Sequence, residues 1–413
     1  LEHDVAKLIF KQEQQGFMFD KIKGEKLYGR LNARRLEISE ELQELFPPII
    51  EKIPFIPKVN NKTKGYVKGE VFYKEKKTVF NPSSRYHVVD RLQRKYNYKP
   101  KVFTADGKPK MDDAILSTLE YPEAKLLAEY FLLDKRVAQL ATGAQAWLKC
   151  VVGDKIHGTC NTNSTVTARA SHAYPNLAQV PSVSVPYGKE CRELFKVPDG
   201  KMLIGVDISG LEVRMLAHYM AKYDGGAYSK VVTDGDIHTE TKKMAGLDSR
   251  DVAKRFYYCF LYGGGVKKIA EVTGKSIREA SNIKRRFLNN LPALNKLITD
   301  VQSAAAKGYI KGLDGRHIKV RSEHAALNTL LQSSGALVCK QWLVEFDKQS
   351  KRCPNYKQVI WVHDEIQIEA PTLCAEKVGK LAVEAIERAG KHFKLRIPLT
   401  GEYKIGHNWS ETH

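Results

Sequence analysis

The sequence predicts an α+β fold in which a small sheet is interrupted by a long helical insertion. Apolar residues at helical spacing, separated by many Lys, Arg and Glu, dominate the first 150 residues. Short apolar runs with polar turns follow over 151–206, and helical patterns return over 212–307. Strand-like runs reappear at 359–362 and 366–369. Two β regions on either side of the helices indicate a single β-containing domain.

The first part of the chain is expected to be helical over residues 4–15 and 24–46, where Pro47-Pro48 ends the second helix. Further helical patterns cover 84–94 and 122–149. Between them, residues 52–77 contain eight lysines and two glutamates, broken by prolines and glycines, which indicates a basic excursion or mobile loop. A solvated linker and a nucleic-acid contact are equally good interpretations of this loop.

Two acidic stretches lie where strand-like runs end, at 207–214 (DISGLEVR) and 362–365 (VHDE). The second stretch is followed at once by another strand-like run, so Asp364 is expected near a hairpin turn. Carboxylates at strand ends suit Mg²⁺, which prefers one or two carboxylates together with water and phosphate oxygens. Two such groups would hold a pair of metals roughly 3.5–4 Å apart, as in phosphoryl and nucleotidyl transfer.

Composition narrows the class of partner. The formal net charge is +20, which indicates a polyanion such as nucleic acid. No apolar stretch approaches the length of a membrane span, so no membrane partner is expected. The seven cysteines are scattered without C-x-x-C spacing, which favours reduced thiols in an intracellular, cytoplasmic protein over disulfides or zinc.

A third informative stretch is the expected helix at 250–263, which Asp248 or Ser249 would cap. Arg250, Lys254, Tyr258 and Tyr262 recur every four residues and so share one ridge. Two cations and two aromatic rings on this ridge match a nucleoside triphosphate laid along it. An amphipathic helix with surface cations and core tyrosines is the alternative, and the neighbouring acidic motifs favour the nucleotide.

In order and spacing, the stretches 207–214, 250–263 and 362–365 resemble motifs A, B and C of family A (DNA polymerase I type) DNA polymerases. Residues 167–169, followed by 175–181, are similar to the DNA-contacting segment of that family. The turn at 312–316 and the stretch 324–332 look most like the phage replicative branch. The resemblance extends over nearly the whole chain.

The resemblance implies a right-hand polymerase with an antiparallel-sheet palm, helical fingers and a helical thumb. The thumb would cover 1–150, the palm 151–218 and 322–413, and the fingers 219–321. The implied reaction is template-dependent addition of deoxynucleotides to a primer 3′-hydroxyl, with two Mg²⁺ ions, during phage-type DNA replication in an infected cell. Primer–template DNA and deoxynucleoside triphosphates are the implied partners, and the enzyme is expected to be monomeric.

Residue roles follow from the same resemblance, position by position. Asp207 and Asp364, with the Ile208 carbonyl, would bind the metals, and Glu365 would be a supporting acid. Arg250, Lys254 and His238 would hold the triphosphate, with Lys254 also as proton donor to pyrophosphate. Tyr258 would stack on the nucleotide, Tyr262 would shape the templating pocket, and Glu212 would exclude a 2′-hydroxyl. The implied DNA contacts are Arg192, Asn328 and Gln332 in the minor groove, Arg169 on the duplex and His363 near the primer terminus.

At some positions this sequence differs from the family motifs, and these differences predict further properties. Tyr258 stands where many bacterial members have Phe, so weak discrimination against dideoxynucleotides is expected. Ala168 replaces the usual glycine before Arg169 and would shift that DNA contact slightly. Some phage members bind host thioredoxin through a long thumb insertion. The stretch 52–77 is short for that role, which argues against thioredoxin but leaves another processivity factor open. Nothing before the thumb resembles a proofreading exonuclease with its D-x-E metal motif. The residues given are therefore expected to be a polymerase portion, with the exonuclease either removed or encoded on a part of the gene not given.

Two other functions compete with a DNA polymerase. A single-subunit RNA polymerase shares the palm chemistry, but Glu212 beneath the sugar argues against ribonucleotides. A non-catalytic DNA-binding module would have no use for unpaired Asp207 and Asp364 beside DNA.

Overall fold

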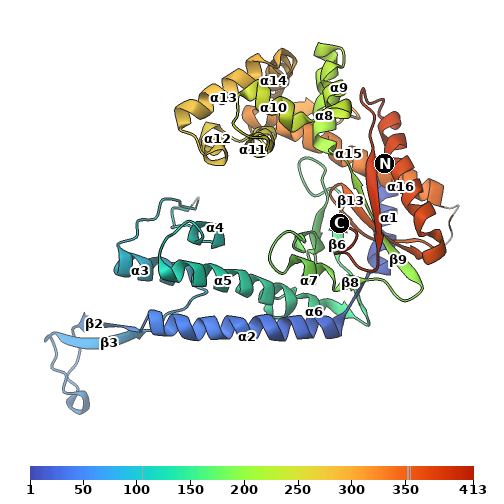
Figure 1. Cartoon of the computed structure of the whole chain (residues 1–413). Coiled ribbons are helices and arrows are strands. Elements are labelled where there is room, and N and C mark those ends of the chain that lie inside the picture. The colour runs from blue at the N-terminus through green and yellow to red at the C-terminus, as the bar shows by residue number, and fades with distance from the viewer. Residues whose placement is uncertain (105, 351–352, 354) are drawn as a thin grey trace. The chain divides into compact units, whose positions relative to one another are not determined.

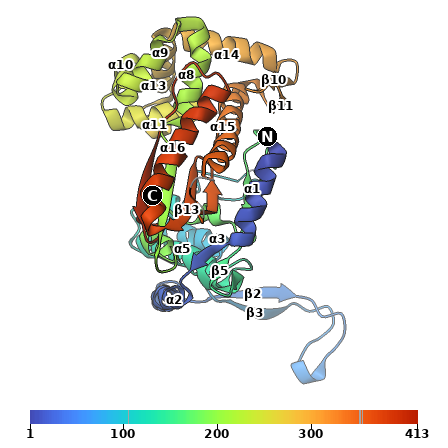
Figure 2. The same ribbon diagram turned by 90° about the vertical axis from the view of Figure 1, so that its right-hand side faces the viewer.

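The computed structural model describes residues 1–104, 106–350, 353 and 355–413, and it separates into two compact units. The larger unit contains residues 1–20 and 150–413, and the smaller contains 21–149. Residues 1–20 belong to the larger unit and not, as the sequence predicts, to one domain with the rest of 1–150. The reason is packing, because α1 (Glu2–Gln15) contacts α15 (Ala326–Ser350) and β12 (Lys357–Val362) (Figures 1 and 2).

The smaller unit is built on two helices, α2 (Lys21–Leu45) and α5 (Pro122–Val137). Arg34 Nε donates to Glu129 Oε1 at 3.0 Å, and Arg35 Nη1 donates to Asp134 Oδ1 at 2.7 Å, so charged pairs accompany the apolar contacts between the helices. The helix expected over 122–149 is broken by a π-helical turn at Ala138–Thr142. The remaining helices of this unit are α3 (Arg85–Tyr96), α4 (Asp113–Leu116) and α6 (Trp147–Cys150).

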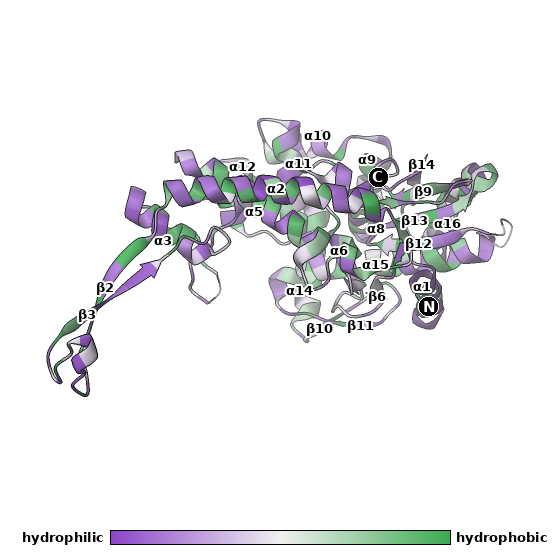
Figure 3. Cartoon of the chain, turned by 90° about the horizontal axis from the view of Figure 1, so that it is seen from below, coloured by the Kyte–Doolittle hydropathy of each residue, from purple (hydrophilic) through white to green (hydrophobic). Residues whose placement is uncertain are grey.

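The expected basic loop at 52–77 is instead part of an antiparallel hairpin, which corrects the prediction. Strand β2 (Ile49–Phe55) pairs with β3 (Phe72–Thr78) in continuous register, and Figure 3 shows β2 as more hydrophobic than β3. Near its tip, the Tyr66 ring lies 5.0 Å from Phe55 and 4.9 Å from Phe72. Lysines in β3 hide the strand pattern in the sequence, and these aromatic contacts order the tip.

A four-stranded antiparallel sheet forms the centre of the larger unit, in the order β12-β13-β9-β14. One sheet face is apolar: Ile204, Val206 and Ile208 are buried in the core to which α16 contributes. The opposite face is polar, because Asp207 pairs with Glu365, and Gly205 with Gln367. Besides β12, the strands are β13 (Glu365–Pro371), β9 (Lys201–Ile208) and β14 (Gly401–Gly406), and α16 spans Ala375–His392.

Gly205 is required by close packing on the polar face of the sheet. A Cβ atom at this position would collide with the Thr412 carbonyl oxygen and the Gln367 side chain. Thr412 also donates from its hydroxyl to Gln367 Oε1 at 2.7 Å. The segment around residue 412 therefore covers the sheet beside the acidic residues.

Helices and smaller sheets complete the larger unit. The helices between β9 and α15 are α8 (Leu211–Asp224), α9 (Ala227–Asp234), α10 (Ile237–Ala245), α11 (Arg250–Leu261), α12 (Val266–Thr273), α13 (Ile277–Asn289) and α14 (Pro292–Ala305). The other helix is α7 (Gly188–Arg192), and the other strands are β1 (Phe17–Phe19), β4 (Val151–Val152), β5 (Lys155–Ile156), β6 (Thr159–Asn161), β7 (Ser171–Ala173), β8 (Phe195–Lys196), β10 (Tyr309–Lys311) and β11 (His317–Lys319). No helix in the described part of the chain is long and apolar enough to cross a membrane.

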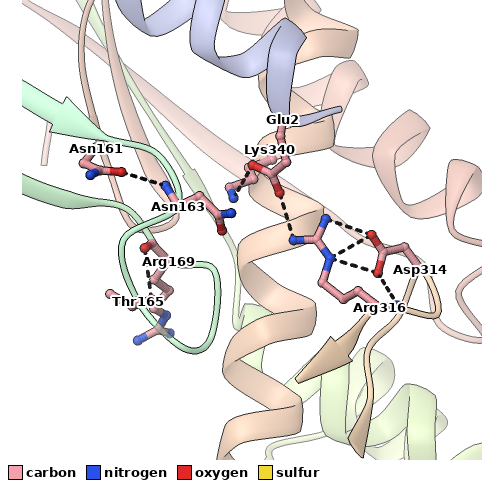
Figure 4. Close-up of polar contacts among 8 residues, drawn as sticks. All are labelled: Glu2, Asn161, Asn163, Thr165, Arg169, Asp314, Arg316 and Lys340. Carbon is pink, nitrogen blue, oxygen red and sulfur yellow. Dashed lines mark hydrogen bonds and ion pairs between the residues drawn. The ribbon is translucent and has the colours of Figure 1, made fainter. Parts of the chain in front are cut away.

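A buried charge network fixes α1 to the larger unit (Figure 4). Lys340, on α15, is completely buried and its Nζ lies 2.7 Å from Glu2 Oε2. The other oxygen of Glu2 accepts from Arg316 Nη1 at 2.9 Å, and Arg316 also pairs with Asp314 at 2.8 Å. One carboxylate on α1 thus neutralises cations from two other elements.

Candidate functional site

The sheet brings the two acidic motifs together. Asp207 is the next-to-last residue of β9, and Asp364 lies in the turn between β12 and β13, as expected. The Ile208 N–H donates to the Asp364 carbonyl oxygen at 3.1 Å, which ties the two motifs directly. His363 in the same turn has φ of 57°, and its carbonyl accepts from Trp361 Nε1 at 2.8 Å. Antiparallel pairing therefore sets both carboxylates at one edge of the sheet.

The surroundings of these carboxylates disfavour their charge. Desolvation by the surrounding protein, followed by the charges of Asp364 and Glu365, raises the pKa of Asp207 to about 7, although part of its side chain is exposed. Burial also raises the pKa of Asp364. Like charges at short range oppose ionisation, and a bound cation relieves that repulsion.

The donor set fits a divalent metal ion that is completed by substrate. Among the described residues, no group of three or more His, Cys, Asp or Glu side chains could hold a metal by itself. Mg²⁺ does not require such a cage, because it binds through one or two carboxylates with water and phosphate oxygens. Asp207, Asp364 and the Ile208 carbonyl are the groups that would hold it.

Glu365 is held by neighbours rather than left free for a metal. Its Oε1 accepts from Trp409 Nε1 at 2.6 Å and from Gln367 Nε2 at 2.7 Å, and its Oε2 lies 2.7 Å from His413 Nδ1. Burial alone would raise the pKa of Glu365, but these hydrogen bonds outweigh burial and lower it. Glu365 therefore remains charged beside Asp207.

Glu212 and Arg169 form an ion pair near the start of α8. Arg169 Nη2 donates to Glu212 Oε1 at 2.6 Å. The Tyr262 hydroxyl also hydrogen-bonds Glu212, and together with burial this contact raises the pKa of Tyr262. Glu212, the expected sugar gate, thus contacts both Arg169, the expected duplex contact, and Tyr262 at the aromatic end of the ridge.

The cationic and aromatic ridge is present, with one change at its end. Ser249 caps α11 by accepting from Val252 N–H at 3.2 Å, and the helix ends at Leu261, so Tyr262 is the residue after its last turn. The rings of Tyr258 and Tyr262 still stack, with centroids 6.3 Å apart and 22° between planes. The two tyrosines therefore keep the shared side that the four-residue spacing predicts.

The cations of the ridge differ in how they are held. Lys254 is exposed, whereas Arg250 donates to both oxygens of Asp236 at 2.6 and 3.3 Å. Asp236 also caps α10 by accepting from the His238 N–H at 3.0 Å. His238 is buried, its ring lies 5.7 Å from Tyr258, and its Nδ1 has no hydrogen-bond partner.

The expected DNA contacts divide into accessible and buried residues. His363 is exposed, and Asn328 and Gln332 are partly exposed on the first turns of α15. Arg192 is buried: its Nε donates to the Pro181 carbonyl at 2.9 Å, and its guanidinium lies 4.6 Å from the Trp409 ring. The structure therefore groups Arg192 with the Glu365–Trp409 cluster rather than with exposed side chains.

Four residues of the site did not emerge from the sequence analysis. Asp236 stands at a helix start, and a search for N-cap residues would have found it. Gln367 lies two residues from Glu365 on β13. Trp409 and His413 are near Glu365 only through the fold. No local pattern marks them, because the contacts span up to 48 positions in the chain.

Two acidic residues with raised pKa values lie at one edge of a sheet, in a unit that also carries a helix with cationic and aromatic side chains. This arrangement is the one expected of a nucleotidyl-transfer enzyme. Comparison with known proteins agrees with this class. The family model for DNA polymerase family A matches residues 58–411. The DNA-directed DNA polymerases of Enterobacteria phage T3 and Escherichia phage T7 are 38% and 37% identical to this chain, over all of its length and 70% of theirs.

The chain belongs to DNA polymerase family A, which confirms the predicted resemblance, the α+β fold class and the prediction of a DNA-directed DNA polymerase. A solved structure has a similar fold at 21% sequence identity, with a TM-score of 0.80 over 100% of this chain and 70% of that chain. It is the POL domain of Pol1 from M. smegmatis in complex with DNA primer-template and dNTP.

Proposed function

We propose that this chain extends a DNA primer on a DNA template by adding deoxynucleotides to the primer 3′-hydroxyl with release of pyrophosphate. The observation that carries the proposal is that Asp207 and Asp364 lie at the same edge of the sheet, where both pKa values are raised. Two Mg²⁺ ions held there would lower the pKa of the primer hydroxyl and offset charge on the pyrophosphate.

The side chains of the chain itself would orient the nucleotide. Arg250 and Lys254 would neutralise the triphosphate, and the exposed Lys254 would donate a proton to the departing pyrophosphate. His238 has an unpartnered Nδ1 and would add a hydrogen bond to a phosphate oxygen. Tyr258, half-buried beside its stacked neighbour Tyr262, would support the base and sugar.

Glu212 would select the sugar. The ion pair with Arg169 and the hydrogen bond from Tyr262 hold its carboxylate in place, which a steric barrier to a 2′-hydroxyl requires. Arg169, His363, Asn328 and Gln332 would contact the primer–template duplex. We assign Arg192 a supporting position behind Trp409, because it is buried.

The test is primer extension with deoxy- and ribonucleotides, with and without Mg²⁺, on wild type and on Asp207→Asn and Asp364→Asn. We expect Mg²⁺-dependent extension by wild type and a loss of at least a thousandfold in kcat for each variant, with DNA binding retained. Asp199→Asn, which changes an exposed carboxylate outside the site, is the matched control. Extension by either site variant at near wild-type rate contradicts the proposal.

A further inference from the structure

A cavity in the larger unit is lined by neither Asp207 nor Asp364. Its volume is about 490 Å³, within the roughly 300–1,000 Å³ typical of small-ligand sites. Helices α8 and α14, strand β10 and Arg396 line it, together with Leu330 of α15. The polymerase reaction proposed above uses none of these side chains.

The rim of this cavity is positively charged. Lys222, Lys307, Lys311 and Arg396 line it and are exposed, and none of them forms an ion pair with a carboxylate in the described part of the chain. Its one acidic residue is Asp300, which accepts from the Tyr223 hydroxyl at 2.8 Å and pairs with Lys296 at 3.3 Å. Four cations without a carboxylate partner make the cavity a site for anions.

The walls of the cavity are aromatic. Tyr219, Tyr223 and Tyr309 line it. The Tyr309 ring stacks on His317 with centroids 4.0 Å apart, and Lys222 lies 5.2 Å from the Tyr223 ring. Aromatic rings framed by cations are the combination that binds the bases and phosphates of single-stranded nucleic acid.

We propose that this cavity binds an unpaired nucleotide of the single-stranded template. The inference rests on the proposed function, which requires a template whose strand is unpaired ahead of the primer. Helix α8 carries both Glu212 and Tyr223, which at 1.5 Å per residue are about 16 Å apart along its axis. The Tyr219 hydroxyl lies 2.7 Å from Ser334 Oγ, so the cavity wall is also joined to the helix that bears Asn328 and Gln332.

Charge at the rim is tested with Lys222→Gln/Lys311→Gln. The matched control is Lys380→Gln/Lys391→Gln, which removes two exposed lysines of α16. Affinity is measured by fluorescence anisotropy on primer–templates with 5′ template overhangs of 2 and 12 nucleotides. We expect wild type and the control to bind the long overhang more tightly. The rim variant should bind the two overhangs equally tightly. For the long overhang, the slope of log affinity against log salt concentration should be smaller by about 1.4 than in wild type.

Stacking is tested with Tyr309→Ala against Tyr309→Phe. The alanine variant should weaken binding to the long overhang about tenfold, because one stacked base is lost, whereas phenylalanine retains the ring. An overhang of abasic sites should bind wild type and Tyr309→Ala equally. Binding of free dTMP in the cavity, without any effect of overhang length, would assign the site to mononucleotides and contradict the template role.

Two results overturn the inference. One is that the rim variant and Tyr309→Ala still bind the 12-nucleotide overhang more tightly than the 2-nucleotide overhang, by the same factor as wild type. The other is displacement of the 12-nucleotide overhang by decaglutamate as effectively as by dT10, which would make the cavity a site for acidic polypeptide. In either case, extension on the 2-nucleotide overhang by the rim variant at wild-type rate leaves the proposed polymerase function intact. Loss of that extension in wild type would instead contradict the proposed function.

Discussion

The carboxylate of Asp207 stands in an environment that disfavours its charge, and that environment is the most specific chemical feature of the molecule. Surrounding atoms and the charges of Asp364 and Glu365 raise its pKa, while Glu365 is kept ionised by Trp409, Gln367 and His413. A fixed negative charge beside two carboxylates increases the attraction for a cation. At the residue scale, a bound cation would therefore take the place of the proton that the raised pKa of Asp207 favours.

This arrangement predicts a pH-dependent stability in the absence of metal. The folded pKa of Asp207 is about 7, above its ordinary value of 3.8, so the folded state holds an extra proton between these values. Stability should therefore fall as pH rises from about 4 to 7. In EDTA at pH 8, Asp207→Asn should melt at a higher temperature than wild type, and at pH 4 the two should be equal. Mg²⁺ should raise the melting temperature of wild type only.

The side chain of Glu212 predicts the sugar preference. Glu212→Ala should admit ribonucleotides and raise their kcat/KM relative to deoxynucleotides by about a hundredfold or more. Arg169→Gln should give a smaller change in the same ratio, because it frees the carboxylate without removing it. Single-nucleotide incorporation measures both. Equal use of both sugars by wild type would show that Glu212 is no gate.

The hydroxyl of Tyr258 predicts how the enzyme treats chain terminators. Wild type should incorporate dideoxynucleotides nearly as well as deoxynucleotides, because the hydroxyl replaces the missing 3′-OH contact. Tyr258→Phe should discriminate against them about a hundredfold or more. Tyr257→Phe, one residue away on the buried side of α11, is the control and should not change the ratio. A thousandfold preference for deoxynucleotides in wild type would contradict this role.

At the scale of elements, α1 shows how one charged residue attaches a helix. Glu2 holds the fully buried Lys340 of α15 and, through Arg316, the turn between β10 and β11. Burial lowers the pKa of Lys340, and Glu2 opposes that shift. The pair therefore joins the first helix to the helix that carries Asn328 and Gln332.

Breaking this pair should destabilise the larger unit. Glu2→Gln leaves Lys340 buried without a carboxylate and should cost roughly 3 kcal/mol, measured by denaturant unfolding followed through fluorescence. The double variant Glu2→Gln/Lys340→Met should recover most of the loss, because it removes the buried charge. Glu25→Gln, on an exposed pair with Lys21, is the control and should change stability by less than about 0.5 kcal/mol. Unchanged stability of Glu2→Gln would mean that the amide oxygen and water stabilise the buried Lys340 ammonium without a carboxylate.

For the whole molecule, the net charge of +20 has a direct consequence for binding. A protein that neutralises six to ten phosphates loses about 10³–10⁵ in affinity between 50 and 200 mM salt. We expect affinity for primer–template DNA to fall within that range, measured by fluorescence anisotropy. Sulfate should weaken binding no less than chloride at equal ionic strength. If affinity did not change with salt concentration, the positive charge would lie on surfaces that DNA does not contact.

Much of the fold was predictable from local pattern. The strands around Asp207 and Asp364, the hairpin turn at Asp364 and the ridge of α11 each follow from a short stretch of sequence, and the structure contains all three. The hairpin at 49–78 was missed, because lysines replace the apolar partners that usually mark a strand. The place of residues 1–20 was also missed, because their packing partners lie far along the chain, from Ile156 in β5 to the residues of β12.

The three motifs that mark the family, with Asp207, Asp364 and the cationic and aromatic helix, were readable from the sequence, because each motif consists of residues close together in the chain. Which charges meet depends on the tertiary structure. It placed Arg169 on Glu212, Asp236 on Arg250 and His413 on Glu365, and it buried Arg192 against Trp409. Electrostatic interactions depend on distance in space, and separation along the chain does not report that distance.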